Sequence, residues 1–475
     1  MEEKEMPSLK KNIFYSVLLV VANYVFPFLT YPYVSRVLGV TGIGACNFVD
    51  SIINYFILFS SLGIQSLGVR EIAKHKDDKE ALDKTFSNLF IVNLVLTGIM
   101  LLLLFVVTLT VPQLSAHKDL MCIGAFKLVF NCLLVEWLFR GLDDFKLITI
   151  RSIVVKTVYV AAVFLFVRKA EDVWVYYLLS SLMVVANALV NIILSRSRVH
   201  LRLRGLQFSA TFKSLLALGV YSILTSMYTT FNVTFLGFAC GETEVGYYTT
   251  ATKIYYLVMA VFTAFTNVML PRMSNLVSRG EMDQFKDSFS MAVEVLFGFS
   301  FPIIIWMMLM APDIVRFISG PGYEGAVMPM IIIAPLIFVV GFEQILVLQT
   351  LLPLGRDKLL LRNSLIGAGI GVALNLALVP VLASVGSSIV WIVAEMTILV
   401  LSLVAVRCEL ELRFPLLPFM KNLVVYLPLV ALVALTLLIP GEAWLRVAVS
   451  SLCVAVYVVI YQIVIRKGAV FAMMK

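Results

Sequence analysis

Apolar stretches long enough to cross a lipid bilayer follow one another along this chain from its first residues to its last. A transmembrane helix needs about 20 mostly apolar residues, because the hydrocarbon core of a bilayer is about 30 Å thick. We expect about fourteen such helices, since that many stretches reach this length. They cover residues 12–35, 43–66, 86–110, 119–139, 147–167, 173–194, 213–239, 246–270, 288–310, 326–350, 359–380, 385–406, 421–440 and 444–465.

Composition excludes a water-soluble globular protein. Of the 475 residues, 61% are hydrophobic and only 14% are charged, and the mean hydropathy is +0.98. A soluble domain has too little interior to bury so much apolar surface. The sequence therefore predicts an all-α integral membrane protein. Its start, "MEEKEMPSLKKN", lacks the small-residue cleavage site of a signal peptide, so we expect the first span to be retained.

The distribution of positive charge predicts the orientation of the spans. The formal net charge is +8, which by itself could indicate a nucleic-acid partner. With the N-terminus inside, however, 28 of the 37 Lys and Arg residues fall in cytoplasmic segments and six in outward loops. This asymmetry follows the positive-inside rule of membrane proteins. We therefore expect both termini in the cytoplasm and no nucleic-acid partner.

The two halves of the chain show an internal repeat at an offset of 202 residues. The first two spans of each half also coincide in register at this offset. The matched residues are Gly39 with Gly241, Thr41 with Thr243, Gly44 with Gly246, Ile52 with Ile254, and Arg70 with Arg272. We infer the duplication of a six-helix unit. Because six is an even number, both copies keep one orientation and are related by an axis along the membrane normal.

The repeat predicts three regions. Residues 1–208 form an N-lobe of six helices that ends in a basic connector, residues 209–412 form a C-lobe of six helices, and residues 413–475 hold two accessory helices. The cytoplasmic linker 70–86 alternates charged and apolar residues. This pattern predicts a short amphipathic helix at the membrane interface.

Polar residues inside the spans recur at helical spacing, so each set lies on one face of a helix. Hydroxyls and amides that face lipid cost free energy. These faces are therefore expected either to bond to neighbouring helices or to line a hydrated cavity. The sets are Asn47, Asp50 and Asn54; Ser222, Thr225, Thr229 and Asn232; and Ser388, Glu395 and Ser402.

Charged residues inside the spans allow two interpretations. Lys127, Lys156 and Lys253 lie within predicted helices, as do Asp50 and Glu395. An unpaired Lys at the bilayer centre costs at least about 3 kcal/mol. One interpretation is a set of internal ion pairs, such as Asp50 with a lysine of the other half. The other is a cavity that presents the lysines to an anionic substrate and uses Asp50 and Glu395 for coupling to an ion or a proton.

Nothing in the sequence has the spacing of a catalytic or metal site. The three histidines lie far apart in loops, and the six cysteines form no CxxC pair. The longest outward loop, residues 311–326, is too short for a catalytic domain. We therefore expect no metal and no cofactor, and a transporter rather than an enzyme such as a membrane polymerase or ligase.

Residues 26–74 carry a family resemblance. Their matching elements are "YPYVSRVLG", "GIG" and "LGVREIA", and the second half adds "EVGYYTTATKI" and "LPRMS". These motifs resemble those of Wzx-type polysaccharide flippases, members of the multidrug/oligosaccharidyl-lipid/polysaccharide exporter superfamily. The resemblance implies two six-helix lobes flanking a V-shaped cavity, two extra helices, and alternating access by rocking of the lobes.

The resemblance also implies a substrate, a location and partners. The substrate would be an undecaprenyl-pyrophosphate-linked oligosaccharide repeat unit, moved across the bacterial inner membrane for a surface polysaccharide such as O-antigen. Membrane lipids, a polysaccharide polymerase and chain-length proteins would be partners. A lipid II flippase is a close variant. A cation-coupled multidrug exporter of the same superfamily stays open, because Asp50 and Glu395 could serve a cationic substrate.

The candidate substrate-binding residues follow from this substrate. Arg36 is carried over from the motif "YPYVSRVLG", whereas the lysines rest on their place inside the spans. Cations would bind the phosphates, and amides, hydroxyls and aromatic rings would bind the sugars. The candidates are Arg36, Asn47, Asn54, Lys127, Lys156, Thr225, Tyr228, Asn232 and Lys253, with Asp50 and Glu395 for ion coupling.

Overall fold

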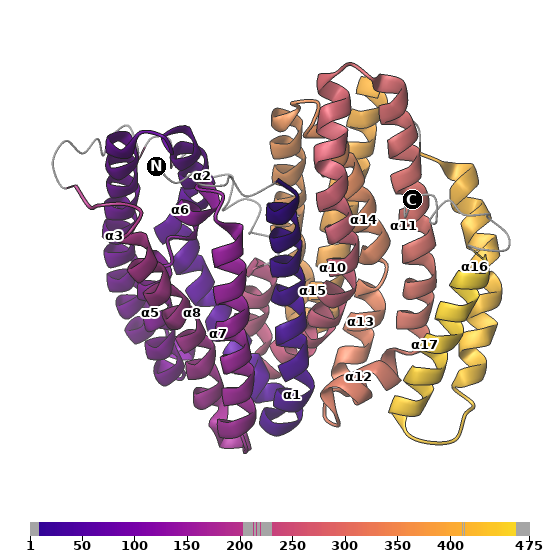
Figure 1. The fold of residues 1–475 in the computed structure, drawn as a ribbon. Coiled ribbons are helices and arrows are strands. Elements are labelled where there is room, and N and C mark those ends of the chain that lie inside the picture. Colours follow the sequence, from indigo (N-terminus) through magenta and orange to yellow (C-terminus); the bar gives the residue numbers. More distant parts are fainter. Residues whose placement is uncertain are drawn as a thin grey trace. The chain divides into compact units, whose positions relative to one another are not determined.

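A computed structural model describes residues 9–202, 230–410 and 414–461, with a few isolated positions between them. Within these ranges the chain is helical, with short turns, and contains no β-strand. The chain divides into two compact units, Met1–Phe238 and Ala239–Lys475. The colours of Figure 1 run from indigo to magenta in the first unit and on through orange to yellow in the second.

The first unit is a bundle of long helices joined by short turns. Its described elements are α1 (Leu9–Ser61), α2 (Ile64–Lys74), α3 (Lys79–Thr110), α4 (Pro112–Ser115), α5 (Lys118–Cys132), α6 (Glu136–Gly141), α7 (Phe145–Phe166), η1 (Ala170–Asp172) and α8 (Val173–Ser195). Helix α1 packs against α3, α5 and α7, and α8 packs against α5 and α7. Four helices, α1, α5, α7 and α8, therefore surround a common interior.

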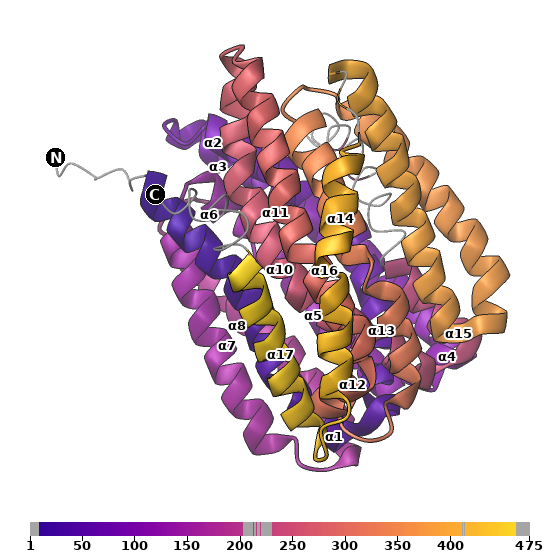
Figure 2. The ribbon, with the colours of Figure 1, turned by 90° about the vertical axis from the view of Figure 1, so that its right-hand side faces the viewer.

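The second unit is also a helical bundle. Its described elements are α10 (Glu242–Ser278), α11 (Met282–Leu309), α12 (Ala311–Ser319), η2 (Glu324–Ala326), α13 (Val327–Ile333), α14 (Leu336–Leu346), η3 (Val347–Leu351), α15 (Asp357–Leu410), α16 (Leu416–Thr436) and α17 (Ala443–Ile460). Helix α14 packs against α11 and α15. Helices α16 and α17 pack against each other and against α11 (Figure 2).

The described chain contains eleven helical stretches that are long and apolar enough to cross a membrane. Two of them, α1 and α15, each contain one residue with non-helical backbone angles, Gly39 and Ala383. Each of these two stretches therefore holds two of the expected spans. The apolar helix Thr230–Cys240 covers the end of the expected span 213–239. The predicted all-α, multi-span membrane architecture is confirmed.

Two glycines at the repeat offset share an unusual backbone conformation. Gly39 lies between the first two spans and has φ 70° and ψ 173°. Gly241 lies at the start of α10 and has φ 85° and ψ −179°. This part of φ/ψ space is open essentially to glycine alone. The repeated bend supports the duplication inferred from the sequence.

Burial in α3 is reversed relative to a helix of a soluble protein. Asn93 and Thr97 are buried, whereas Leu102, Phe105 and Leu109 are 63% to 70% exposed. Polar side chains in lipid are costly, so they turn toward neighbouring helices. The apolar side chains left outside suit a hydrocarbon solvent. In this helix the polar residues therefore face the interior of the unit.

The linker 70–86 is not a separate interfacial helix, so that prediction is wrong. Its first residues belong to α2 and its last residues to α3, with a turn between them. Asp78 ends the turn by accepting hydrogen bonds from the backbone amides of Glu80 and Ala81 at 3.0 and 3.1 Å. An acidic N-cap satisfies amides that have no partner within the helix. The capping residue thus starts α3 about two turns earlier than hydropathy indicates.

Helix α17 forms polar contacts with two other helices of the second unit, α12 and α11. Arg446 of α17 forms a two-point ion pair with Asp313 of α12, with N–O distances of 2.8 and 2.5 Å. The indole nitrogen of Trp306 in α11 donates a hydrogen bond to the Ser450 hydroxyl at 3.0 Å. The last two expected spans are thus packed into this unit. The predicted region boundaries at residues 208 and 412 stay predictions.

Replacing Gly39 or Gly241 with Ala should destabilise the protein by about 1–3 kcal/mol, because a Cβ makes this backbone conformation unfavourable. Thermal unfolding of the purified protein in detergent measures the effect. Gly98→Ala is the matched control, since Gly98 lies in α3 and an added Cβ there meets open space. Equal unfolding temperatures for Gly39→Ala and Gly98→Ala would show that the bend does not require glycine.

Candidate functional site

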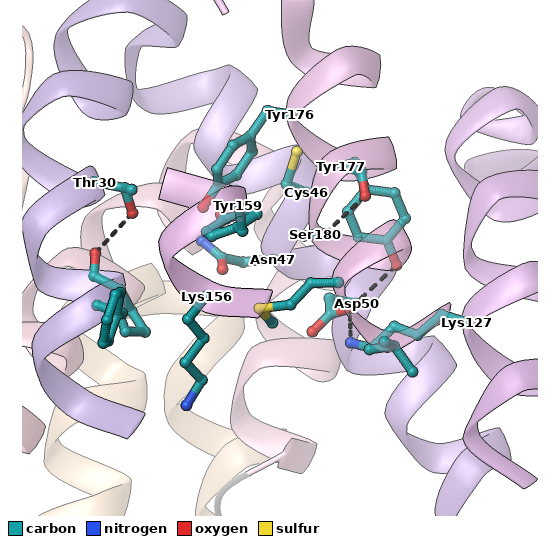
Figure 3. A pocket seen from close by; sticks show the side chains of 14 residues that line it. Thr30, Cys46, Asn47, Asp50, Lys127, Lys156, Tyr159, Tyr176, Tyr177 and Ser180 are labelled. Atoms are coloured by element: carbon teal, nitrogen blue, oxygen red, sulfur yellow. Dashed lines mark hydrogen bonds and ion pairs between the residues drawn. The ribbon is translucent and has the colours of Figure 1, made fainter. Parts of the chain in front are cut away.

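A pocket of about 330 Å³ lies inside the first unit, among α1, α5, α7 and α8 (Figure 3). Its lining residues are Phe26, Pro27, Thr30, Cys46, Asn47, Asp50, Lys127, Lys156, Tyr159, Tyr176, Tyr177, Ser180, Met183 and Val184. Polar and charged side chains thus gather inside a bundle whose helices are apolar enough to span a membrane.

Helical spacing brings these side chains together. Lys156 and Tyr159 are three residues apart on α7, and Tyr176 and Ser180 are four residues apart on α8. Residues at these separations lie on the same face of a helix. In α1, Pro27 has no amide hydrogen, which leaves one carbonyl of the preceding turn without its usual helical partner. Each helix therefore turns a polar face toward the pocket.

Asp50 is the hydrogen-bonding centre of the pocket. Its Oδ1 lies 2.5 Å from the ammonium nitrogen of Lys127 on α5 and accepts a 3.2 Å hydrogen bond from the Tyr177 hydroxyl of α8 (Figure 3). Its Oδ2 accepts a hydrogen bond from the Asn54 amide at 3.2 Å. The side chains of Asp50 and Lys127 are still 31% and 17% exposed. One accessible carboxylate thus links α1, α5 and α8.

Lys156 brings a second positive charge to the pocket. Its side chain is 8% exposed, and its ammonium donates a hydrogen bond to the side-chain oxygen of Asn23 on α1. Figure 3 shows it apart from the Asp50–Lys127 pair. Within the described part of the chain, no carboxylate oxygen lies within 4.0 Å of this ammonium. A buried charge with only a neutral partner is costly, so the position favours an anionic ligand.

The structure brings several of the sequence-derived candidates together. Asn47, Asp50, Lys127 and Lys156 line the pocket, and Asn54 bonds to Asp50. Asp50 does form an internal ion pair, but with a lysine of the same half of the chain. The ion-pair interpretation therefore holds for Asp50 and Lys127, which also line a pocket. Substrate binding by the lysines and ion coupling by Asp50 stay predictions.

Other candidates lie elsewhere. Arg36 is exposed and donates a hydrogen bond to a backbone carbonyl of its own helix at 3.0 Å. Asn232 is fully buried in the first unit, and Lys253 is half-buried in the second. Thr225 and Tyr228 lie outside the described residues. Binding roles for these five residues stay predictions.

Glu395 belongs to a separate polar group in the second unit. It is 5% exposed and accepts a hydrogen bond from the Trp391 indole at 3.0 Å. It lies on α15, which packs against α14, the helix that carries Glu343. The coupling role of Glu395 stays a prediction.

Sequence reasoning missed the aromatic wall of the pocket. Tyr159, Tyr176 and Tyr177 all line it. A tyrosine ring offers an apolar face and a polar hydroxyl, which suits a ligand with both kinds of surface. The helical spacing of Tyr159 to Lys156 and of Tyr176 to Ser180 is the signal that could have revealed them.

Arg151, which lies inside the expected span 147–167, is only 7% exposed. Its guanidinium lies 2.7 Å from the carboxylate of Glu136 and donates to the Asn191 side chain. The Asn191 amide in turn donates to the backbone carbonyl of Leu134, next to the break between α5 and α6. This cluster joins α6, α7 and α8 through side-chain hydrogen bonds, although the buried Nε of Arg151 has no hydrogen-bond partner. It therefore fits the interpretation of polar residues as helix-to-helix bonds.

The pocket suits a ligand that is anionic and rich in hydroxyl groups. Ammonium groups bind phosphate or carboxylate oxygens, and the side chains of Asn47, Thr30 and Ser180 can exchange hydrogen bonds with hydroxyls. In the ranges that the structure covers, no three His, Cys, Asp or Glu side chains gather as they would around a metal ion.

The fold is that of multi-span membrane transporters. It matches a solved structure of the lipid II flippase MurJ in an inward closed conformation with a TM-score of 0.80, at 14% identity, over 95% of this chain and 99% of that one. It also matches an inward-facing multidrug resistance transporter of the MATE family with a TM-score of 0.64, at 16% identity, over 84% and 98% of the two chains. At these identities the likeness shows the fold alone.

The sequence itself identifies the family. The chain belongs to the family described as polysaccharide biosynthesis protein, whose profile matches residues 9–277. A putative O-antigen transporter of Escherichia coli strain K12 is 28% identical over 411 residues, which cover 84% of this chain and 97% of the relative. The family resemblance seen in residues 26–74 is thereby confirmed.

The two single replacements of Asp50 and Lys127 should together lower the free energy of unfolding by more than the double replacement does. Asp50→Ala and Lys127→Ala each leave one charge without its ion-pair partner, whereas the double variant leaves neither. We expect a coupling energy of about 0.5–3 kcal/mol from a double-mutant cycle, measured by unfolding in mixed micelles. Asp119→Ala, at an exposed position at the start of α5, is the control partner for Lys127→Ala and should add independently. Additivity in the Asp50 cycle would mean that the pair contributes nothing to stability.

Proposed function

We propose that this protein is a flippase that moves undecaprenyl-pyrophosphate-linked oligosaccharide repeat units across the bacterial inner membrane, by alternating access, for the synthesis of a surface polysaccharide. Three findings support the proposal. The chain belongs to the polysaccharide biosynthesis protein family, a relative of similar length is named a putative O-antigen transporter, and the fold is shared with a lipid II flippase.

The buried ammonium of Lys156 is the observation that carries this proposal. It lines a pocket within a membrane-spanning bundle, and among the described residues its hydrogen-bond partner is the neutral amide of Asn23. Such a charge destabilises the protein unless an anion offsets it. A pyrophosphate head group would supply the missing negative charge. Lipid tails and neutral sugars alone would not.

The energetics of the substrate explain why such a pocket is needed. An isolated phosphate ion in hydrocarbon costs tens of kcal/mol by Born estimates, so the head group cannot cross the bilayer unaided. Lys156 and Lys127 would replace water around the phosphates, and Asn47, Ser180 and the tyrosine rings would replace it around a sugar. The pocket of about 330 Å³ is within the usual size range for small-molecule sites. The polyprenyl tail would stay in the lipid.

The remaining features of the proposal follow from the sequence. Both termini lie in the cytoplasm, as the positive-inside distribution of Lys and Arg predicts. The protein acts as a transporter and not as an enzyme, because its loops offer no catalytic domain. A polysaccharide polymerase and chain-length proteins are its expected partners, and it needs no cofactor.

A cation-coupled multidrug exporter is the second candidate. The shared fold of the MATE transporter and the carboxylate of Asp50 in the pocket favour it. A cationic drug would have to displace Lys127 from Asp50 while Lys156 repels it from the same pocket. An anionic substrate meets no such repulsion. A lipid II flippase remains a variant of the first proposal that differs in the sugars carried.

Deletion of the gene distinguishes these functions. We expect loss of the surface polysaccharide, measured on gels of extracted glycan, with unchanged resistance to cationic drugs. Expression of the intact gene from a plasmid should restore the glycan. A deletion strain with normal glycan and increased drug sensitivity would favour the exporter instead.

Lys156→Ala should export poorly when it is expressed in the deletion strain. A charge-assisted hydrogen bond contributes about 1.5–3 kcal/mol, so its loss should lower head-group affinity about tenfold to a hundredfold. Surface glycan and immunoblots of the membrane fraction measure export and protein level. Lys156→Arg keeps the charge and should retain more export than Lys156→Gln.

Lys118→Ala is the matched control for Lys156→Ala, because Lys118 is exposed at the start of α5 and lies outside the pocket. It should export normally. Normal export by Lys156→Ala at a normal membrane level would exclude Lys156 from head-group binding.

A further inference from the structure

The carboxylate of Asp50 occupies the position at the Lys127 ammonium that an anionic ligand would take. The carboxylate oxygen lies 2.5 Å from the Lys127 ammonium, close enough for a direct charge-assisted hydrogen bond. A phosphate oxygen that binds the same ammonium competes with this carboxylate for its positive charge and brings a second negative charge beside Asp50. Both side chains are partly exposed and line the pocket, so a ligand can reach them.

We propose that Asp50 is a displaceable counter-ion: an anionic head group replaces it on Lys127, and Asp50 then binds a proton. The inference rests on the flippase function proposed above and adds the link between anion and proton at the same pocket. It also gives the two lysines different roles. Lys156 attracts the anion. Lys127 binds the anion in place of Asp50 and so couples anion binding to the protonation of Asp50.

The surroundings of Asp50 favour this exchange. Asp50 is the one carboxylate among the described lining residues, so the proton has no nearer acidic acceptor in the pocket. The other charged and titratable groups of the lining are Lys127 of α5, Lys156 and Tyr159 of α7, Tyr176 and Tyr177 of α8, and Cys46 of α1. Tyr177 and Asn54 donate hydrogen bonds to Asp50 from two other directions. They can hold the carboxyl group in place whether or not it keeps Lys127.

The exchange moves one proton and changes no other covalent bond. Without substrate, Asp50 is a carboxylate and Lys127 an ammonium ion. When a phosphate oxygen binds Lys127, the partly buried carboxylate faces an anion instead of a cation, which favours its neutral form. Water that reaches the pocket delivers the proton to an oxygen of Asp50, and Lys127 keeps its three protons. Release of the head group reverses both events.

Linkage gives this mechanism a measurable sign. If anion binding is accompanied by uptake of one proton, a lower pH must strengthen anion binding. For one proton the dissociation constant falls by up to about tenfold for each pH unit. Asp50→Asn has no group to protonate at this place, so it should lose this component of the pH dependence. It should also bind the anion more tightly than the wild type at high pH, because Lys127 is no longer held by a carboxylate.

The experiment measures binding of geranyl pyrophosphate to the purified full-length protein by calorimetry, between about pH 5 and pH 8. The probe itself titrates in this range, so the informative quantity is the difference in slope between wild type and Asp50→Asn. Asp119→Asn makes the same chemical change at an exposed position of α5 and should keep the wild-type slope. The double variant Asp50→Ala/Lys127→Ala leaves neither charge of the pair, so it provides the comparison if Asp50→Asn is poorly produced.

Each outcome supports or overturns the inference. A wild-type slope steeper by up to tenfold per pH unit, absent from Asp50→Asn and from the double variant, supports it. Equal slopes in wild type and Asp50→Asn overturn it while leaving the flippase function intact, provided that gene deletion abolishes the glycan. Equal slopes with an affinity that depends on sodium would assign a metal cation, not a proton, to Asp50. Failure of the wild type to bind the probe, with normal glycan after gene deletion, would overturn both proposals.

Discussion

Lipid offers no hydrogen bonds, and this constraint decides where the polar side chains of the protein lie. Helix α3 exposes Leu102 and Phe105 and buries Asn93. In the same unit, Arg151 of α7 pairs with Glu136 of α6. Polar groups that cannot find such partners must be solvated by a pocket or by a ligand. Charged side chains with a protein partner in this unit therefore contribute to stability, and those without one are available to bind a ligand.

Two lysines of the pocket show this difference. Lys127 has a carboxylate at 2.5 Å, whereas the ammonium of Lys156, among the described residues, donates to the amide oxygen of Asn23. The first arrangement is nearly neutral and can persist without a ligand. The second leaves a positive charge that the protein does not compensate within 4.0 Å among the described residues. An anion that reaches both lysines would be attracted by Lys156 without competition and would have to compete with Asp50 for Lys127. Lys156 thus gives the pocket affinity for an anion, and the anion must compete with Asp50 to bind Lys127 as well.

Much of the fold could be predicted from hydropathy, because each span must supply about 20 apolar residues in sequence. The pairing of Asp50 with Lys127 could not, since it depends on how α1 and α5 pack. The pairing of Arg151 with Glu136 could not be predicted either, since it depends on how α6 and α7 pack. The tyrosines of the pocket gave a periodic signal, yet apolar spans contain many aromatic residues at such spacings. Periodicity identifies a face of a helix, and packing decides which faces meet.

The ion pair of Asp313 with Arg446 has a consequence for the making of the protein. The two residues are 133 positions apart, so the ribosome completes α12 well before it reaches α17. Until then a carboxylate that ends up 7% exposed has not met its guanidinium. A nascent chain cut short before α17 would keep that group without its cation. The contact therefore forms only in a chain that includes α17.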